Sequence, residues 1–268
     1  MDSGTAESDI EYLKNYFLAN NCFPLFSQVI IETQTDCNRK CTFCPQHHQE
    51  RNFKKIEWQV YKKIIDELAR IGFAGRVALF ITNEPLLETR LLKMIRYAKN
   101  KSSRLFLDIT TNGKLLSINK VDSLLKAGID NININDYRSD REKNPNGFSK
   151  NITELFQIFR SNPKISFNRR STKEILSNYA GVIEQENKIP ISEFCNYPFR
   201  KIAFSADGNL ILCCNDYMYR TNFGSILENN VENLWNTEKL NKYRMNLLSK
   251  KRCGLCEGCN EVQDYGVF

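Results

Sequence analysis

The most informative stretch of the chain is Cys37-Asn-Arg-Lys-Cys41-Thr-Phe-Cys44, which has the spacing C-x₃-C-x₂-C. It follows residues 29–32, whose apolar character predicts a short strand. Three thiolates this close in sequence are typical of a metal or iron–sulfur site. They can hold three irons of a four-iron cluster and leave the fourth iron open to a small chelating molecule. The spacing also fits a zinc site with His47 or His48 as the fourth ligand.

The composition is that of an ordinary globular protein. The 268 residues are 41% hydrophobic and 26% charged, which excludes a disordered or low-complexity chain. No run approaches 18 uncharged apolar residues, and the acidic first 20 residues lack the apolar segment of a secretory signal. We therefore expect a cytoplasmic protein whose ten cysteines stay reduced. The net charge of +7 is scattered, so we expect no nucleic-acid or membrane partner, although an anionic substrate is tolerated.

Hydrophobic periodicity predicts strands that alternate with helices up to about residue 190. Gly72 and Gly128 are expected to end two of the helices. This alternation is typical of a parallel sheet built from βα units, and thus of an α/β fold. The predicted strands cover 29–32, 76–82, 104–110, 129–135 and 164–168, and the predicted helices cover 56–71, 89–101, 119–127 and 150–160.

The pattern changes after residue 190. Asp207-Gly208 lies between two short apolar runs and predicts a β-hairpin, and residues 231–248 have the apolar spacing of one amphipathic helix. A helical stripe near the N-terminus consists of Ile10, Leu13, Phe17 and Leu18. We therefore predict a helical extension (1–27), an α/β core (28–190) and a small C-terminal domain (191–268).

The cysteine motif resembles that of the radical S-adenosylmethionine (SAM) enzymes, in which C-x₃-C-x-Φ-C follows the first strand. Here Phe43 is the aromatic residue. Asn83-Glu84-Pro85 follows the second predicted strand, where the family has a Gly-Gly-Glu-Pro type of motif, and Thr111-Asn112-Gly113 follows the third. The resemblance implies a partial (β/α)₆ barrel of the TIM type, with its chemistry at the carboxyl ends of the strands.

The resemblance also implies roles for individual residues. Glu84 would accept a hydrogen bond from the SAM amino group, and Thr111 and Asn112 would reach the ribose. The backbone near Phe43 would contact the adenine, and Asn83 would lie beside the cofactor at a position where Gly is usual. The ligands of the SAM-binding [4Fe–4S] cluster would be Cys37, Cys41 and Cys44.

The later cysteines resemble the C-x₉₋₁₅-G-x₄-C … C-x₂-C pattern of the SPASM and twitch extensions of this family. Gly208 occupies the glycine position of that pattern. Because the chain has too few cysteines for the full form, the resemblance implies a twitch-like domain with one auxiliary [4Fe–4S] cluster. A four-cysteine zinc ribbon with the same ligands is the alternative. The implied ligands are Cys195, Cys213, Cys256 and Cys259.

Most of residues 29–260 resemble the aminocyclitol dehydrogenases of antibiotic biosynthesis, with a weak stretch at 138–190. The resemblance implies that a 5′-deoxyadenosyl radical oxidises a secondary alcohol of a sugar or aminocyclitol, and that a flavodoxin or ferredoxin supplies electrons. We expect Arg169 to bind substrate from the end of a strand. Two alternatives stay open, namely a radical epimerase with Cys214 or Cys253 as hydrogen-atom donor, and a non-catalytic zinc-binding module.

Overall fold

A computed structural model describes residues 6–138, 147–171, 177–184 and 193–261 of the chain. Its centre is a seven-stranded sheet with the order β5-β4-β3-β2-β1-β6-β7. The neighbours from β5 to β6 are parallel, and β7 is antiparallel to β6. The strands are β1 (Gln28–Ile31), β2 (Arg76–Ala78), β3 (Phe106–Thr111), β4 (Asn131–Arg138), β5 (Ile165–Ser171), β6 (Lys201–Phe204) and β7 (Leu210–Ile211).

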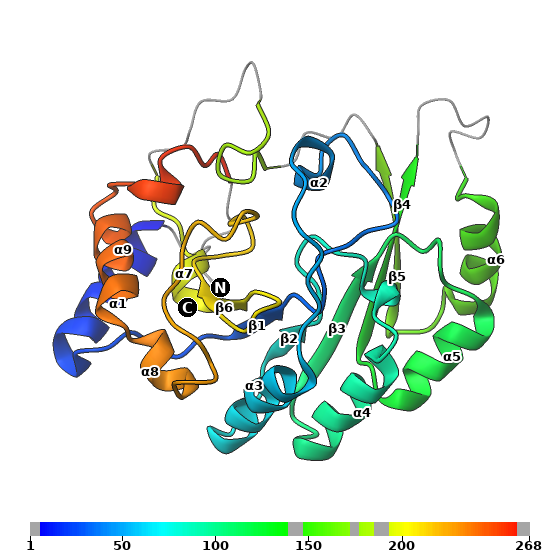
Figure 1. The fold of residues 1–268 in the computed structure, drawn as a ribbon, viewed down its shortest axis with the longest axis horizontal. Coiled ribbons are helices and arrows are strands. Elements are labelled where there is room, and N and C mark those ends of the chain that lie inside the picture. The colour runs from blue at the N-terminus through cyan, green and yellow to red at the C-terminus, as the bar shows by residue number, and fades with distance from the viewer. Residues whose placement is uncertain (1–5, 139–146, 172–176, 185–192, 262–268) are drawn as a thin grey trace.

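Helices follow the strands as the periodicity predicted, and α3 to α6 lie along one side of the sheet (Figure 1). Gly128 ends α5 in the left-handed conformation, with φ of +102°. The helices are α1 (Ala6–Asn20), α2 (Pro45–His48), α3 (Trp58–Arg70), α4 (Leu91–Lys101), α5 (Ile118–Ala127), α6 (Lys150–Phe159), α7 (Tyr197–Arg200), α8 (Val231–Trp235) and α9 (Glu238–Leu248), with short 3₁₀ helices η1 (Pro85–Leu87) and η2 (Gly254–Cys256).

The parallel strands form a partial barrel, because β5 and β7 are the two edges of an unclosed sheet. The predicted hairpin is confirmed, since β6 and β7 pair on either side of Gly208. However, β6 also pairs in parallel with β1 along its whole length, from Gln28 with Lys201 to Ile31 with Phe204. The predicted C-terminal domain thus contributes the sixth parallel strand to the core sheet, while its boundary near residue 190 stays a prediction.

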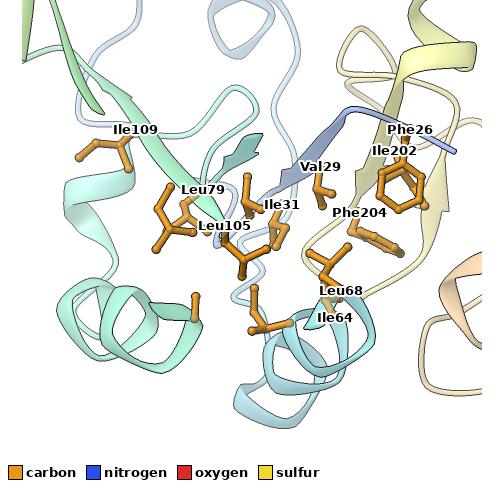
Figure 2. Packing of buried hydrophobic residues seen from close by; sticks show 14 of the residues in the cluster. Phe26, Val29, Ile31, Ile64, Leu68, Leu79, Leu105, Ile109, Ile202 and Phe204 are labelled. Atoms are coloured by element: carbon orange, nitrogen blue, oxygen red, sulfur yellow. The ribbon is translucent and has the colours of Figure 1, made fainter. Parts of the chain in front are cut away.

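Side chains alternate between the two faces of the sheet. The helix-facing set packs against Ile64 and Leu68 of α3 and includes Val29, Ile31, Leu79, Ile109, Ile202 and Phe204 (Figure 2). The opposite set contains a smaller apolar cluster that consists of Ile30, Ala78, Ala203 and Ile211. Polar residues occupy the other positions of that second face, and this is the face that lines the cavities of the protein.

The N-terminal extension packs beside the C-terminal helices (Figure 1). Trp235 donates a hydrogen bond to the carbonyl oxygen of Pro24 at 2.9 Å, and its ring stacks edge-on against Phe26. Ile10 and Leu13 of α1 are buried as predicted, but Leu18 is 82% exposed, so its place in the buried stripe was wrong. No helix in the part of the chain that the structure describes is long and apolar enough to cross a membrane.

The single helix predicted for 231–248 is also corrected. The chain forms α8 and α9 with a break at Asn236, because the hydroxyl oxygen of Thr237 accepts a hydrogen bond from the Leu240 backbone N–H and so caps a new helix. The break lets α9 turn so that Arg244 is buried over the Trp235 ring, with 3.8 Å between the guanidinium carbon and the ring centre. Apolar spacing does not reveal a break of one or two residues.

Candidate active site

The three cysteines of the first motif lie in the loop between β1 and α3 and line one cavity. A hydrogen bond of 3.0 Å from the Cys44 backbone N–H to the Cys41 carbonyl oxygen folds the loop back on itself. Burial raises the pKa of the Cys37 thiol to about 11 and that of Cys44 to about 12, and nearby thiols add to both shifts. Without a bound cation, these groups are therefore neutral thiols at neutral pH.

The same cavity is lined by residues that follow β2, β3 and β4, so it lies at the carboxyl ends of parallel strands. Phe43 forms another part of the wall and packs against Tyr137 with 5.2 Å between ring centres. Glu84, Thr111 and Asn112 face the cavity together. The structure thus brings every residue predicted around the first cysteine motif to one place.

Glu84 is the most constrained carboxylate of this cavity, with 2% of its surface exposed. It accepts hydrogen bonds from the Thr111 hydroxyl at 2.6 Å, the Asn112 backbone N–H at 2.9 Å and the Leu86 backbone N–H at 3.1 Å. Burial raises its pKa, and the three donors oppose that rise. Its backbone N–H also donates to the carbonyl oxygen of Asp36, which fixes Glu84 relative to the cysteine loop.

Asn83 and Asn112 line the cavity and hold the loops around it in place. The Asn83 side chain accepts from the Ile81 backbone N–H at 2.9 Å and donates to the Thr33 hydroxyl at 3.2 Å. These bonds hold the turn that a glycine was expected to make. The Asn112 amide lies 3.9 Å from the sulfur of Cys37, within reach of a weak hydrogen bond. Asn112 is therefore tied to the cysteine loop as well as to Glu84.

The four later cysteines gather in the C-terminal region, around η2. Burial raises the pKa of the Cys195 and Cys256 thiols to about 12 and that of Cys213 well above its usual range. Each of these shifts is increased by other members of the group, and Cys259 contributes to those of Cys195 and Cys256. The four thiols that the sequence grouped are therefore neighbours in space.

A second cavity of about 300 Å³ separates the two cysteine groups. It shares three wall residues with the first cavity, namely Phe80, Ile81 and Tyr179. Cys214 and Asn215, which directly follow Cys213, line its far side. The two cavities therefore adjoin, the first at the cysteine loop and the second at the edge of the four-cysteine group.

The sequence did not reveal the ion pair that closes the cysteine loop. Arg51 and Glu32 are joined by 2.8 Å between Nη2 and Oε1, and their side chains are 7% and 0% exposed. Arg51 also donates to the carbonyl oxygen of Tyr217 at 2.8 Å, and its guanidinium carbon lies 4.0 Å from the centre of the Tyr217 ring. The pair links the cysteine loop, β1 and the C-terminal region, which are far apart in sequence.

Comparison with known families agrees with this geometry. The family model described as the radical SAM superfamily matches residues 31–146, which carry the first cysteine motif and the Glu84 cavity. Residues 31–146 are therefore the part of the chain that matches the radical SAM superfamily. A second model, described as an iron–sulfur cluster-binding SPASM domain, matches residues 195–260. The four later cysteines lie within the residues that this second model matches.

Two curated relatives extend the comparison. The S-adenosyl-L-methionine-dependent 2-deoxy-scyllo-inosamine dehydrogenase of Niallia circulans is 26% identical over 244 residues, which are 89% of this chain and 94% of the relative. The GTP 3′,8-cyclase of Chlorobaculum tepidum is 33% identical over 115 residues, which are 43% of this chain and 34% of the relative. Only the first relative is matched along nearly its whole length.

Solved structures confirm the fold. The crystal structure of BtrN in complex with AdoMet and 2-DOIA has a TM-score of 0.74 at 24% identity, and the match covers 91% of this chain and 98% of that one. Streptococcus suis SuiB bound to the precursor peptide SuiA has a TM-score of 0.53 at 12% identity, over 86% of this chain and 69% of that one. The radical SAM fold with a SPASM domain is therefore the fold of this chain.

Radical SAM and SPASM domains use SAM and [4Fe–4S] clusters, and the residues present fit these groups. Within the described ranges, no three Cys, His, Asp or Glu side chains converge tightly enough to hold a single metal ion. His47 and His48 are exposed and line neither cavity, so they do not complete the zinc site that the spacing left open.

The SPASM region also contains an orphaned donor. Arg252 lies close enough to Cys195 and Cys256 to oppose the rise in their pKa, yet its Nη2 is buried without a hydrogen-bond acceptor in the described chain. The sulfur of a bound cluster is an acceptor of the kind that such a donor lacks. This observation supports a cluster among the four thiols.

The two catalytic candidates from the sequence have different surroundings. Arg169 is exposed and lines neither cavity, and its guanidinium carbon lies 6.0 Å from the centre of the Phe148 ring, on the helix side of β5. Its placement does not support the predicted substrate contact. The next residue, Arg170, faces Tyr137 and opposes the rise in its pKa that burial causes. Cys214 lines the second cavity, and Cys253 accepts a hydrogen bond from Asn246 at 3.2 Å.

Proposed function

We propose that this chain is a radical SAM dehydrogenase that oxidises a secondary alcohol of a sugar or aminocyclitol to a ketone. The observation that carries the proposal is the pair of adjoining cavities, with three thiols at one end of the pair and four at the other. The dehydrogenase from Niallia circulans, matched over 94% of its length, supports it. When bound, SAM and the clusters supply two things: a 5′-deoxyadenosyl radical, which removes a hydrogen atom from the substrate, and an acceptor for the electron that the substrate then loses.

At the first end, we assign Cys37, Cys41 and Cys44 as ligands of a [4Fe–4S] cluster. Three thiolates leave one iron position open, and the loop that carries them forms a wall of the first cavity. Glu84 is assigned to accept a hydrogen bond from the SAM amino group. Its Oε2 accepts a single bond, from the Asn112 backbone, so it can accept another.

Other residues of the first cavity shape the rest of the SAM site. The backbone near Phe43 is assigned to the adenine, and Asn112 to the ribose. Thr111 already donates its hydroxyl hydrogen to Glu84, so it retains only acceptor capacity toward a ribose hydroxyl. Asn83 lines the same cavity, and its side-chain bonds position the turn before Glu84 beside the assigned SAM site.

At the second end, we assign Cys195, Cys213, Cys256 and Cys259 as ligands of an auxiliary [4Fe–4S] cluster. Oxidation of an alcohol releases one hydrogen atom, one proton and one electron, so an electron acceptor must lie near the substrate. Four thiolates close the coordination of a cluster, which suits electron transfer better than substrate binding. A low-potential donor such as flavodoxin or ferredoxin would supply the electron that SAM cleavage consumes.

One observation favours a second function. The Cys214 thiol lines the cavity assigned to substrate, and burial raises its pKa, so it keeps its hydrogen at neutral pH. A neutral thiol beside a substrate radical can donate a hydrogen atom, which would make the protein an epimerase. The two functions share every step up to the substrate radical and differ in what that radical does next.

A mass analysis in D₂O separates the two functions. Anaerobically reconstituted protein receives SAM, a reductant, and a panel of aminocyclitols, sugars and nucleotide sugars. We expect a product that lacks two hydrogens, together with an equal amount of 5′-deoxyadenosine. A product of unchanged composition with one solvent deuterium, lost in Cys214→Ala, would show an epimerase instead. Cys22→Ala is the matched control, because this thiol lines neither cavity.

A further inference from the structure

The floor of the second cavity is built from the first residues of three neighbouring strands. Gln28 begins β1, and it is level in the sheet with Arg76 of β2 and Lys201 of β6. All three side chains line the cavity, on the face that also carries Ile30 and Ala78. This floor lies at the amino ends of the strands, whereas the first cavity lies at their carboxyl ends.

Lys201 supplies the cationic group of the floor that has no acceptor. In the described residues its ammonium makes no hydrogen bond and no ion pair, and instead lies over the Tyr197 ring, 3.3 Å from the ring centre. Burial lowers its pKa, and the nearby Cys214 and Glu261 oppose that fall without a hydrogen bond to the ammonium. Arg76 differs, because it donates to both carboxylate oxygens of Asp108, at 2.7 Å to Oδ2 and 3.0 Å to Oδ1.

The other walls limit what can face Lys201. Gln28 Oε1 is buried and accepts no hydrogen bond from the described chain. Glu261, across the cavity, is already engaged by the Tyr197 hydroxyl at 3.1 Å and the Asn215 amide at 3.0 Å. The groups that lack partners are thus an ammonium and, beside it, an amide oxygen. An acceptor oxygen with a nearby hydroxyl group would satisfy both.

We infer that the second cavity binds a hydroxylated ring whose far end carries an oxyanion, a carboxylate or a phosphate, directed at Lys201. The inference rests on the proposed function and names its substrate class. The apolar wall of Ile30, Ala78, Phe80 and Ile81 suits the C–H face of such a ring, and a cavity of about 300 Å³ suits one six-membered ring with its substituents.

An amino group at that position is disfavoured. A substrate ammonium directed at Lys201 would face a like charge, with Arg76 beside it, while the Glu261 carboxylate lies across the cavity. An oxyanion gains a charge-assisted hydrogen bond from the same ammonium.

Calorimetry on the cluster-loaded protein tests the inference. SAM is present and no reductant is added, so binding is measured without turnover. The probes are glucuronate, myo-inositol 1-phosphate, scyllo-inositol and scyllo-inosamine. We expect at least one of the two anions to bind 10-fold or more tightly than scyllo-inositol, and the amine to bind most weakly. Comparison of the two anions shows whether a carboxylate or a phosphate is preferred.

Two variants and a control assign the effect to one group. Lys201→Met keeps an unbranched stem and removes the charge, so we expect the anion affinity to fall 10- to 100-fold. Lys201→Arg keeps a cation and should restore part of that affinity. Lys239→Met is the matched control, because Lys239 also lies over an aromatic ring, that of Phe223, but is exposed and lines neither cavity. Thermal melts confirm that each variant is folded.

Each result decides the question. Equal or tighter binding of scyllo-inosamine, failure of both anions to bind, or unchanged anion affinity in Lys201→Met would overturn the inference. A different result would refute the proposed function alone. If an anion binds through Lys201 but yields no ketone, the dehydrogenase is refuted and the inference about the binding site stands. An amine that is oxidised although no anion binds would support the dehydrogenase and refute the inference.

Discussion

Replacement of Arg51 by Met tests the account of how the cysteine loop is held. The substitution removes a guanidinium that contacts Glu32 through both oxygens, at 2.8 and 3.3 Å, and that lies between the rings of Tyr217 and Tyr219. Met fills part of the space with an apolar chain, so the main effect is the loss of charge. Among the described residues, Glu32 then stays fully buried with Thr82 as its remaining donor, through both its hydroxyl and its backbone N–H.

The expected destabilisation follows from that burial. Removal of one partner from a buried ion pair costs about 3–5 kcal/mol, because the remaining charge has neither water nor a counter-ion. For a chain of this size, the melting temperature should fall by roughly 6–15 °C. Lys40→Met is the matched control in the same loop, since Lys40 and Glu50 are 73% and 90% exposed, and its effect should be below about 1 kcal/mol.

The pH dependence gives an independent signature. Burial raises the pKa of Glu32, and the Arg51 guanidinium opposes that rise. Without Arg51 the folded-state pKa lies further above the unfolded value, so the native state takes up a proton as the pH falls. The deficit of Arg51→Met should therefore be larger at pH 8 than at pH 5.

Thermal melts of the anaerobic apoprotein at pH 5 and pH 8 measure these effects. They compare wild type, Arg51→Met, and a double variant that carries Arg51→Met and Glu32→Gln. The double variant should recover part of the loss. A melting temperature within 2 °C of wild type, or a double variant as unstable as Arg51→Met, would refute the reasoning.

Three further predictions concern the turns and the cluster ligands. Gly208→Ala should cost about 1–3 kcal/mol in a denaturant melt, because Gly208 has φ of +80° and an added Cβ would lie 2.5 Å from Cγ1 of Val60; no change in midpoint would contradict this. Cys44→Ser and Cys256→Ser should each lose one of the two clusters, so iron analysis should give about half the wild-type content in both, and an undiminished value would reject the ligand assignment. Burial raises the pKa of Cys44 to about 12, so little of the reactive thiolate is present at pH 8. Mass spectrometry of the apoprotein should therefore show that Cys44 is alkylated at least about 100-fold more slowly than free cysteine. A comparable rate would contradict the burial of Cys44.

The sequence was most informative where a local pattern has one structural solution. The βα alternation placed Glu84, Thr111 and Asn112 at adjacent strand ends, and they meet there as expected. Gly128 ended its helix because only a residue without Cβ takes up that backbone conformation without strain. These features depend on a few neighbouring residues, so they can be predicted from spacing alone.

Features that depend on distant partners were not predictable. Arg51 and Glu32 look like ordinary surface charges in the sequence, and only the fold buries them against each other. Arg169 and Arg170 are adjacent and chemically identical, so the face that each occupies depends on the register of β5 with β4. The orphaned Nη2 of Arg252 likewise became visible only once its burial was known.

The parallel pairing of β6 with β1 has a consequence for how the protein is made. During synthesis β1 emerges early, with the buried residues Val29, Ile30 and Ile31, but its neighbour β6 is not complete until residue 204. Until then one side of β1 is an unpaired, apolar edge, which is a site for aggregation. The nascent chain therefore needs protection over most of its length, and a fragment that ends before β6 should be insoluble even though it contains the first cysteine motif.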